Sequence, residues 1–506
     1  MSNFKNKAKS FFGGEGFSSS VLATAVIALI LAVNVIFYIL TITLGLYITP
    51  AEKDLTLLSG STDALFADPI EKGRKVKISF CYPEEELKTH STGAFVYKTV
   101  TEFEKRYPDF IEVEYINIIT RRNSKGELVD LSQYKTDMRG NETAIFKSSV
   151  IFESNTLSKR NYIVVTDLYT SAGFSGFYTL DSTGSITSYN GEEMVAAMVS
   201  WVLHDVHKTA YLTTTHSEQA DPSFANLLSA SGYYIDVINL KEKEIPEDAG
   251  LLIISNPRSD FERAAAGTAV RTEIERLRTY LDGGGSIYVT LDPYVKSLPV
   301  LESFLAEHGI AVSSTPNGSG RLCNIVKDTN NAITTDGFVL VADFAEGGAA
   351  DAISDKVNDF TDGRVIIREV AALELSASAR PLLLSSPSSV CEADGKTVNT
   401  DGSYPIAAYS TTSGGGNVIV IPSVYASVSS ALVTNGYANK EFLFAVLEEI
   451  CGAEGAPYGC NDILYDTETL ENLTMGTARA YTALIIAVPT ALAIVGGVLI
   501  IRRKNR

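Results

Sequence analysis

Two long apolar stretches near the ends of the chain predict membrane-spanning helices. The first, 21–48, lies in a region that has no charged residue between Glu15 and Glu52. As a helix its 28 residues would reach about 42 Å, more than the ~30 Å of a bilayer's hydrocarbon core. The apolar region of a cleaved signal peptide, the alternative, is far shorter, at about 7–15 residues. The second stretch, 480–501, holds 22 uncharged residues, and Asn34 in the first predicts a polar contact with a neighbouring helix.

After the first stretch, the hydrophobic pattern switches between strand and helix periods. The segment 75–82 is typical of a strand. In 95–107 the apolar residues recur every three or four positions, which predicts a helix, and 111–117 alternates as a strand does. A strand–helix–strand order favours a parallel pair. Two further strands and a helix, expected at 144–153, 161–169 and 191–204, complete an N-terminal α/β domain at 49–205.

A second domain, 206–452, shows a more regular alternation of strands and helices, typical of a doubly wound, flavodoxin-like sheet. Strands are expected at 208–216, 233–240, 251–256 and 286–292, and helices at 221–231, 261–282 and 298–310. A strand-rich section follows near 313–412 and is interpreted as a β-rich insertion. A buried strand at 414–423 and a helix at 439–452 end the domain, and 453–479 is a linker.

The charge is distributed unevenly along the chain. The formal net charge is −18, yet the tail 1–20 and the last five residues, 502–506, are both basic. Because positive flanks stay in the cytoplasm, two spans predict cytoplasmic termini and one large, acidic extracytoplasmic region in a two-pass protein of the cell membrane. An acidic region of this size is a poor partner for nucleic acid.

Five cysteines are scattered through the chain, and neither CxxC nor a Cys/His metal spacing occurs. Cys451 and Cys460 are nine positions apart and would suit a disulfide outside the membrane. An odd count and scattered positions fit buried free thiols as well. His204 and His207 have a spacing that permits metal binding on a helix, but no third ligand is evident, so we expect no metal or other cofactor.

Polar residues follow three of the predicted strands of the second domain. His216 and Glu218 come after the first strand, Asn256 after a later one, and Asp292 after the strand at 286–292. In parallel sheets the carboxyl ends of the strands line the ligand crevice, so these four residues are candidate ligand-binding residues. The alternative is that His216 caps the following helix or forms local hydrogen bonds.

Several stretches, taken in order, resemble one family. They are ITPAEKDLTLLSGST, KVKISFCYPEE, YKTVTEFEKRYPDFIEVEYIN, TAYLTTTHSEQ, IPEDAGLLIISNPRSDF, LRTYLDGGGSIYVTLDPY and GGGNVIVIPS followed by NKEFLFAVLEEICG. The chain resembles the GldG-like auxiliary component of an ABC-type transport system, a family first associated with gliding motility. Its ectodomain is similar to the class I glutamine amidotransferase-like fold, shared with an intraflagellar transport protein. The resemblance implies two partners, a multispan permease and a cytoplasmic ATP-binding subunit.

The same resemblance bears on catalysis. Class I amidotransferases carry a nucleophilic Cys on a sharp turn after a central strand, whereas here the turn contains Asp292 and Pro293. The chain also contains no GxxxxGK[ST] phosphate loop. We therefore expect a non-enzymatic, membrane-anchored accessory subunit whose ectodomain binds or gates substrate or braces the permease. The alternatives are a stand-alone cell-surface ligand- or glycan-binding protein and a hydrolase or amidotransferase.

Overall fold

The computed structural model describes most of the chain between residues 58 and 464. The described residues are 58–156, 160–165, 174–180, 186–262, 271–295, 297–317, 320–360, 363–400, 402–432, 437–460 and 463–464. All of them belong to one structural unit, Leu55–Tyr465. The division predicted at residue 205 stays a prediction.

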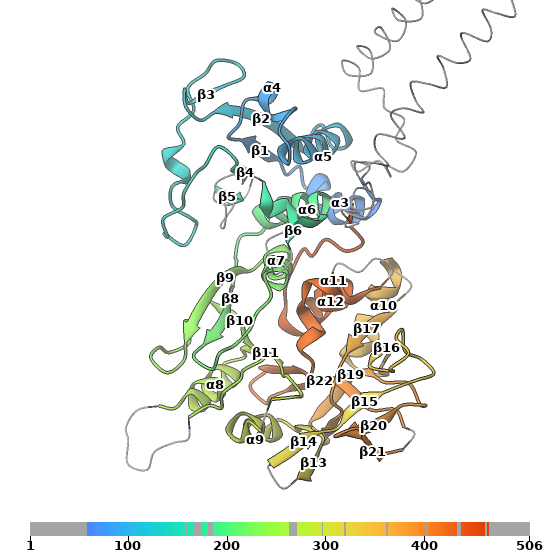
Figure 1. Ribbon diagram of the computed structural model, residues 1–506. Helices are drawn as coiled ribbons and strands as arrows, with labels where there is room; N and C mark the ends of the chain where they lie inside the picture. The colour runs from blue at the N-terminus through green and yellow to red at the C-terminus, as the bar shows by residue number, and fades with distance from the viewer. Residues whose placement is uncertain are drawn as a thin grey trace, which may run out of the picture. The chain divides into compact units, whose positions relative to one another are not determined.

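The first part of the described chain builds a sheet around β1, Val76–Phe80 (Figure 1). Within the described residues its strand order is β3-β2-β1-β4-β5. β1 pairs in parallel with β2, which confirms the predicted parallel pair, and antiparallel with β4. The other strands are β2 (Ile111–Asn117), β3 (Arg122–Asn123), β4 (Val150–Ser154) and β5 (Asn161–Val165).

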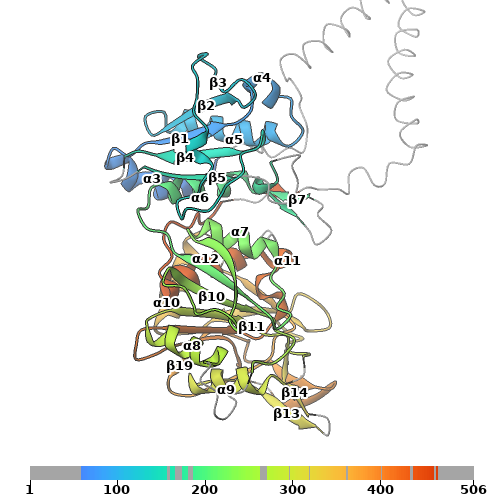
Figure 2. The same ribbon diagram turned by 90° about the vertical axis from the view of Figure 1, so that its left-hand side faces the viewer.

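Two helices cover one face of this sheet, and their periodicity explains why. Val76, Ile78 and Phe80 alternate along β1 and share a buried cluster with Val96 and Phe103 of α5, as the periods of strand and helix require. α5 and α6 contact each other and the strands (Figure 2). The helices of this part are α3 (Ser61–Glu71), α4 (Glu84–Leu87), α5 (Gly93–Arg106) and α6 (Gly191–Val202).

Helix α6 is buried along its whole length, since every residue from Gly191 to Val202 is buried. It contacts α5, β4 and β5 of the first sheet and α7 of the following part. After its acidic first turn, α6 is almost entirely apolar from Met194 to Val202, and a helix that is apolar on all sides normally lies inside a core. The residues of α6 therefore belong to a hydrophobic cluster that continues from the five-stranded sheet into the next one.

In the described part of the chain, nine strands form the main sheet, in the order β17-β16-β19-β22-β23-β11-β10-β8-β9. The strands from β9 to β23 are parallel. Numbered along the chain, these five have the order 2-1-3-4-5, which is the flavodoxin-like order. They are β8 (Thr209–Thr214), β9 (Tyr234–Asn239), β10 (Ala249–Ser255), β11 (Ser286–Thr290) and β23 (Asn417–Ile421).

Helices pack on both faces of the parallel strands. Alternate residues of β10 divide between two buried clusters: Ile253 lies with α7 and α12, and Ile254 with α8 and α9. Figure 2 shows α7 and α12 on one side of the sheet and α8 and α9 on the other. The helices are α7 (Pro222–Ala230), α8 (Glu273–Asp282), α9 (Pro299–Glu307), α11 (Ser429–Leu432) and α12 (Asn439–Cys451).

The section predicted as a β-rich insertion continues the main sheet. Four of its strands extend that sheet in antiparallel fashion from β23. The section also contains a helix, α10 (Ala349–Phe360), which the strand-rich prediction missed. The four strands are β16 (Val339–Phe344), β17 (Val365–Arg368), β19 (Ala379–Leu384) and β22 (Pro405–Thr411).

Shorter elements complete the described chain. Three-residue and four-residue 3₁₀-helices are η1 (Ser132–Tyr134), η2 (Ser175–Phe177) and η3 (Val424–Ser427). The remaining strands pair in small sheets. They are β6 (Tyr178–Leu180), β7 (Ile186–Tyr189), β12 (Ile310–Val312), β13 (Ser314–Asn317), β14 (Gly320–Cys323), β15 (Ile325–Lys327), β18 (Leu373–Leu375), β20 (Val390–Ala393), β21 (Lys396–Asn399) and β24 (Ile463–Leu464).

One part of the predicted fold class requires correction. None of the helices that the structure describes is long and apolar enough to cross a membrane. The longest of them, α5, has 14 residues and is about 21 Å long, against the ~30 Å that a span needs. This finding contradicts the predicted two-pass membrane topology, with its cytoplasmic termini and extracytoplasmic region. The stretches 21–48 and 480–501, with Asn34, lie outside the described residues.

Candidate functional site

The parallel part of the main sheet contains one topological switch point. From β8 the chain passes to β9 on one side, and the later strands β10, β11 and β23 follow on the other side. In open α/β sheets, ligands bind outside the carboxyl ends of the strands at such a point. The loops that follow β8 and β10, residues 215–221 and 256–262, are therefore where a site is expected.

These two loops pair with each other. The backbone N–H of Gln219 donates to the carbonyl of Ser255 at 2.8 Å, and that of Arg258 donates to the carbonyl of His216 at 2.8 Å. The hydroxyl of Ser255 also donates to the carbonyl of Gln219, at 2.7 Å. Because the residue numbers rise on one loop as they fall on the other, the pairing is antiparallel.

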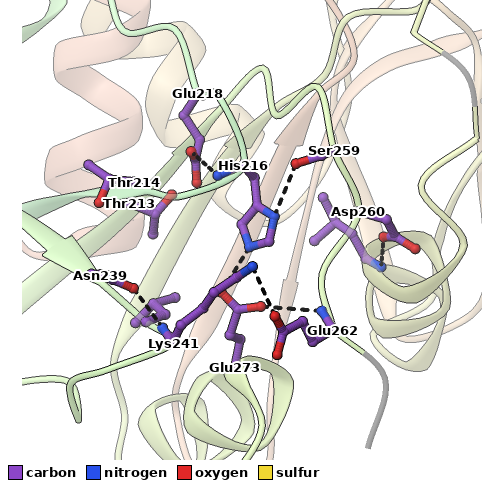
Figure 3. Close-up of polar contacts among 12 residues, drawn as sticks. Thr213, Thr214, His216, Glu218, Asn239, Lys241, Ser259, Asp260, Glu262 and Glu273 are labelled. Carbon is purple, nitrogen blue, oxygen red and sulfur yellow. Dashed lines mark hydrogen bonds and ion pairs between the residues drawn. The ribbon is translucent and has the colours of Figure 1, made fainter.

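The side chain of His216 is buried next to these two loops. The residue is 1% exposed, and its ring stacks on Phe261 with 4.2 Å between the ring centroids. Nε2 of His216 lies 2.8 Å from Oε1 of Glu273, at the start of α8 (Figure 3). Nδ1 faces the hydroxyl of Ser259 at 3.5 Å. The alternative that His216 caps the next helix is wrong, since Asp221 caps α7.

Glu273 is a buried carboxylate that holds the histidine ring in place. Burial raises the pKa of Glu273, but the hydrogen bond with His216 and the charge of the ring lower it by more, so the net pKa lies below the ordinary value. The ionised carboxylate only accepts hydrogen bonds, so Nε2 of His216 carries a proton. The other carboxylate oxygen of Glu273, Oε2, accepts the backbone N–H of Glu262 at 3.3 Å.

Glu218 and Asn256 each present an oxygen without a partner. Oε2 of Glu218 accepts the backbone N–H of His216 at 2.7 Å, whereas Oε1 is buried and has no hydrogen-bond partner within the described structure. Oδ1 of Asn256 is in the same situation, in a residue that is 4% exposed. A buried oxygen without a partner costs about 1–3 kcal/mol, so this pair calls for an explanation.

The backbone around this pair adopts conformations that non-glycine residues rarely use. Thr215, Ser217 and Asn256 have φ values of 107°, 57° and 50°. Asn tolerates the left-handed region, but a β-branched Thr at positive φ is an outlier. Such conformations persist where the surrounding structure imposes them, and they gather at binding sites and active sites.

Asp292 follows β11, the strand next to β10. Its Oδ1 accepts the backbone N–H of Tyr294 at 2.9 Å, within its own turn. Among the contacts described, it has no hydrogen bond with the other three candidates, although Asn256 is tied to the end of β11 by its N–H to the carbonyl of Thr290 at 3.0 Å. The structure thus brings His216, Glu218 and Asn256 together and leaves Asp292 on the neighbouring turn.

The loop after β10 is fixed at two further points. The carboxylate of Asp260 accepts the N–H groups of Val300 and Leu301, at 2.9 and 3.2 Å, at the start of α9. Glu262 forms an ion pair with Lys241 at 3.0 Å, and this hydrogen bond raises the pKa of Lys241 (Figure 3). The loop therefore has little freedom to move away from its partner after β8.

The sequence prediction missed Ser259, Phe261 and Glu273. A usable signal existed for Glu273, because Thr272 and Glu275 have the spacing of a capping box. That motif places the start of α8 at residue 273, whereas the predicted helix began at 261. Residues 263–270 lie outside the described residues.

The rings of the two other histidine candidates have different partners. Nδ1 of His204 lies 2.8 Å from the carbonyl of Ser200, and the ring of His207 stacks on Trp201 with 3.6 Å between centroids. Among the described residues, no group of three or more His, Cys, Asp or Glu side chains is placed to hold a metal ion.

None of the five cysteines forms a disulfide in this structure, and Cys451 and Cys460 are both buried. The predicted possibility of a disulfide between these two is therefore not what the structure shows. Burial raises the pKa of Cys451 to about 12, and it does the same for Cys81. A thiol with so high a pKa is a weak nucleophile at neutral pH.

Comparison with known proteins gives similarity only among solved structures. No family model matches this chain, and no curated protein matches it. The mmIFT52 N-terminal domain is 18% identical, with a TM-score of 0.35 over 49% of this chain and 99% of that domain. A ThuA-like protein from Bacteroides uniformis is 12% identical, with a TM-score of 0.31 over 50% of this chain and 97% of its own. A ThuA-like protein from Parabacteroides merdae is 9% identical, with a TM-score of 0.29 over 52% and 98%. At these identities and TM-scores, none of them assigns a family or an activity to this chain.

Proposed function

We propose that this chain is a non-catalytic accessory subunit of an ABC-type transport system, whose α/β region binds a ligand or braces the permease. The resemblance of its ordered segments to the GldG-like family supports the choice of partners, a multispan permease and a cytoplasmic ATP-binding subunit. Because the chain contains no GxxxxGK[ST] phosphate loop, ATP hydrolysis falls to the second of these partners.

One observation carries the binding role: in the loops after β8 and β10, Glu218 and Asn256 each have a buried oxygen with no hydrogen-bond partner among the residues that the structure describes. A purely structural network would satisfy its buried acceptors. The neighbouring pair of His216 and Glu273 is buried and hydrogen-bonded at 2.8 Å, so it ties the loop after β8 to the start of α8.

The turn after β11 supports the absence of catalysis. This turn contains Leu291, Asp292 and Pro293, so it offers neither a thiol nor a hydroxyl as a nucleophile. The carboxylate of Asp292 already accepts a backbone N–H of its own turn. The position at which an amidotransferase would place its nucleophile is thus used to shape the loop.

Affinity purification of the full chain from its native cells tests the accessory role. We expect a multispan permease and an ABC-type ATP-binding protein to co-purify with the tagged chain in proportion to it. Purification of the chain without either protein, under conditions that keep other ABC complexes together, would overturn the proposal. That result would favour the alternative of a stand-alone ligand- or glycan-binding protein.

A second candidate function, a serine hydrolase, is favoured by the order Ser259, His216, Glu273. A hydroxyl, a ring and a buried carboxylate in this order have the logic of a catalytic triad. Two features weigh against it. The distance from Oγ to Nδ1 is 3.5 Å, and the N–H groups of Arg258 and Ser259 donate to the carbonyl of His216 instead of forming an oxyanion hole.

A fluorophosphonate probe separates this second candidate from a binding role. We expect no labelling of Ser259 in the folded chain. Labelling that disappears in Ser259→Ala and in His216→Gln would instead establish the hydrolase.

A further inference from the structure

We propose that a cavity between helices α3 and α6 binds a small carboxylate that carries an apolar body. The cavity is lined by residues of α3, of the C-terminal end of α6 and of the segment that follows α12. It shares no residue with the loops at the switch point, and it does not depend on the transport role proposed above.

The cavity lies where α3 and α6 contact each other (Figure 2). Its volume is about 290 Å³, close to the lower end of the ~300–1,000 Å³ of small-molecule pockets. Gly455 forms part of its wall with a φ of 82°. A Cβ at this position would lie 2.1 Å from Oγ of Ser200 and 3.1 Å from Cε1 of His204. Only a glycine therefore lets this segment approach the end of α6 so closely.

The walls of the cavity are largely apolar. Leu65, Phe66 and Pro69 line it from α3, and Leu203 lines it from the residue after α6. Positions 65, 66 and 69 lie on one face of a helix, since residues four apart are neighbours on its surface. Such walls favour a ligand with a hydrocarbon part, because its burial removes apolar surface from water.

Arg74 supplies an unpaired positive charge to this cavity. Nη1 donates to the carbonyl of Thr156 at 2.7 Å, which leaves other N–H groups of the guanidinium available. Among the residues that the structure describes, Arg74 belongs to no ion pair. Lys72, which also lines the cavity, is instead paired with Asp68 at 2.7 Å. Arg74 is therefore the group that calls for an anion.

The remaining polar groups of the cavity are consistent with an anion. The carbonyl of Ser200 accepts Nδ1–H of His204 at 2.8 Å, and Nε2 of that ring faces Glu454 at 3.5 Å. The hydroxyl of Ser200 has no hydrogen-bond partner within the described part of the chain, so it remains a donor. A cationic ligand would meet the charge of Arg74, and the one carboxylate of the lining, Asp68, is already bound to Lys72.

The guanidinium group narrows the class of anion. Its planar fork forms two parallel hydrogen bonds with a carboxylate, and these charge-assisted bonds are stronger than those between neutral groups. A carboxylate with a hydrocarbon chain also uses the apolar walls, whereas inorganic phosphate does not. The geometry and the chemistry of the lining together therefore select a small apolar carboxylate.

Calorimetric titration of the full chain with hexanoate tests the inference. Hexan-1-ol is the matched neutral probe, and inorganic phosphate is an anion without an apolar body. We expect hexanoate to bind and the other two probes to bind at least about tenfold more weakly, as the loss of a charge-assisted hydrogen bond implies. Absence of hexanoate binding, or a probe that binds as tightly as hexanoate, would overturn the inference.

Two variants locate the site. Arg74→Gln removes the guanidinium and should weaken hexanoate binding by about tenfold or more. Leu203→Ala removes part of an apolar wall and should weaken it severalfold. Arg380→Gln is the matched control, because Arg380 in β19 is exposed and does not line the cavity, and its affinity should equal that of the wild type. Thermal unfolding checks that each variant is folded, and unchanged binding in a folded Arg74→Gln would overturn the assignment.

Failure of this inference is distinct from failure of the proposed function. The accessory role is tested by co-purification, which needs no ligand in this cavity. Co-purification of the transport proteins together with absence of hexanoate binding would overturn the carboxylate site alone.

Discussion

At the scale of single residues, His216 shows how one side chain can organise a whole site. It joins the loop after β8 to α8 through Glu273, and its carbonyl accepts the backbone of the loop after β10. Its ring is buried against Phe261. The backbone and side chain of one residue thereby fix three segments, which explains why Glu218 and Asn256 have defined positions.

We predict that Glu273→Ala destabilises the chain by about 2 kcal/mol at neutral pH, because it leaves a buried N–H of His216 without an acceptor. Urea unfolding of both proteins measures this difference. Glu262→Gln, a change at an exposed ion pair, serves as the control and should cost less than about 1 kcal/mol.

The contact between His216 and Glu273 also predicts that the stability of the chain depends on pH. The pKa of Glu273 is lower in the folded chain than the ordinary value of 4.5. Its stabilising contribution is therefore complete above the ordinary value and is lost as the pH falls through the lower folded value. The stability difference between the wild type and Glu273→Ala should shrink when urea unfolding is repeated below about pH 4. A difference that grows on acidification would contradict this account.

At the scale of elements, a buried ion pair joins α12 to α6. Lys440 and Glu193 are 8% and 6% exposed, and their charged groups are in direct contact. Lys440 also donates to the carbonyl of Cys460 at 3.3 Å. Two charges placed so deeply are tolerated because each neutralises the other.

Lys440→Met should therefore destabilise the chain by about 3–5 kcal/mol, because the buried carboxylate of Glu193 loses the positive charge that neutralises it. The double variant Lys440→Met/Glu193→Met should recover much of this loss, as measured by chemical unfolding of the four proteins of the cycle. A double variant that is less stable than the sum of the single losses would show that the pair has a different role.

The elements also show where sequence periodicity succeeds and where it fails. The strand–helix alternation from 208 to 310 follows from local patterns, and β8, α7, β9, β10, β11 and α9 lie close to their predicted positions. Helix α10 was missed although its buried residues, Ala350, Ile353 and Val357, recur at helical spacing among polar neighbours. The pairing of β22 with β19 joins strands about 20 residues apart, and no local pattern encodes such a partner.

The candidate site could be predicted only in part from the sequence, because local patterns do not encode contacts between distant residues. Strand ends are local features, and they placed His216, Glu218 and Asn256 at one edge of the sheet. The antiparallel pairing of their loops depends on backbone conformations at Thr215 and Ser217 that these residue types rarely adopt. The contact with Glu273 spans 57 positions, so only the folded chain reveals it.

At the scale of the whole molecule, the two larger sheets share one hydrophobic cluster through α6. We predict that they unfold together in a single transition. Trp201 is the one tryptophan of the chain; it lies in α6 and is 2% exposed. Its fluorescence should follow the same urea curve as the far-UV circular dichroism. Two separated curves would show that the sheets are independent.

The burial of α6 on every side also limits how this chain can change over generations. Because α6 packs in the cores of both sheets, separating the sheets would deprive one of them of this helix. A recombination event near residue 205 would leave one descendant with an exposed apolar face and the other with an empty groove. Neither product would be a soluble, self-sufficient module. The two sheets are therefore expected to have been inherited together as one unit.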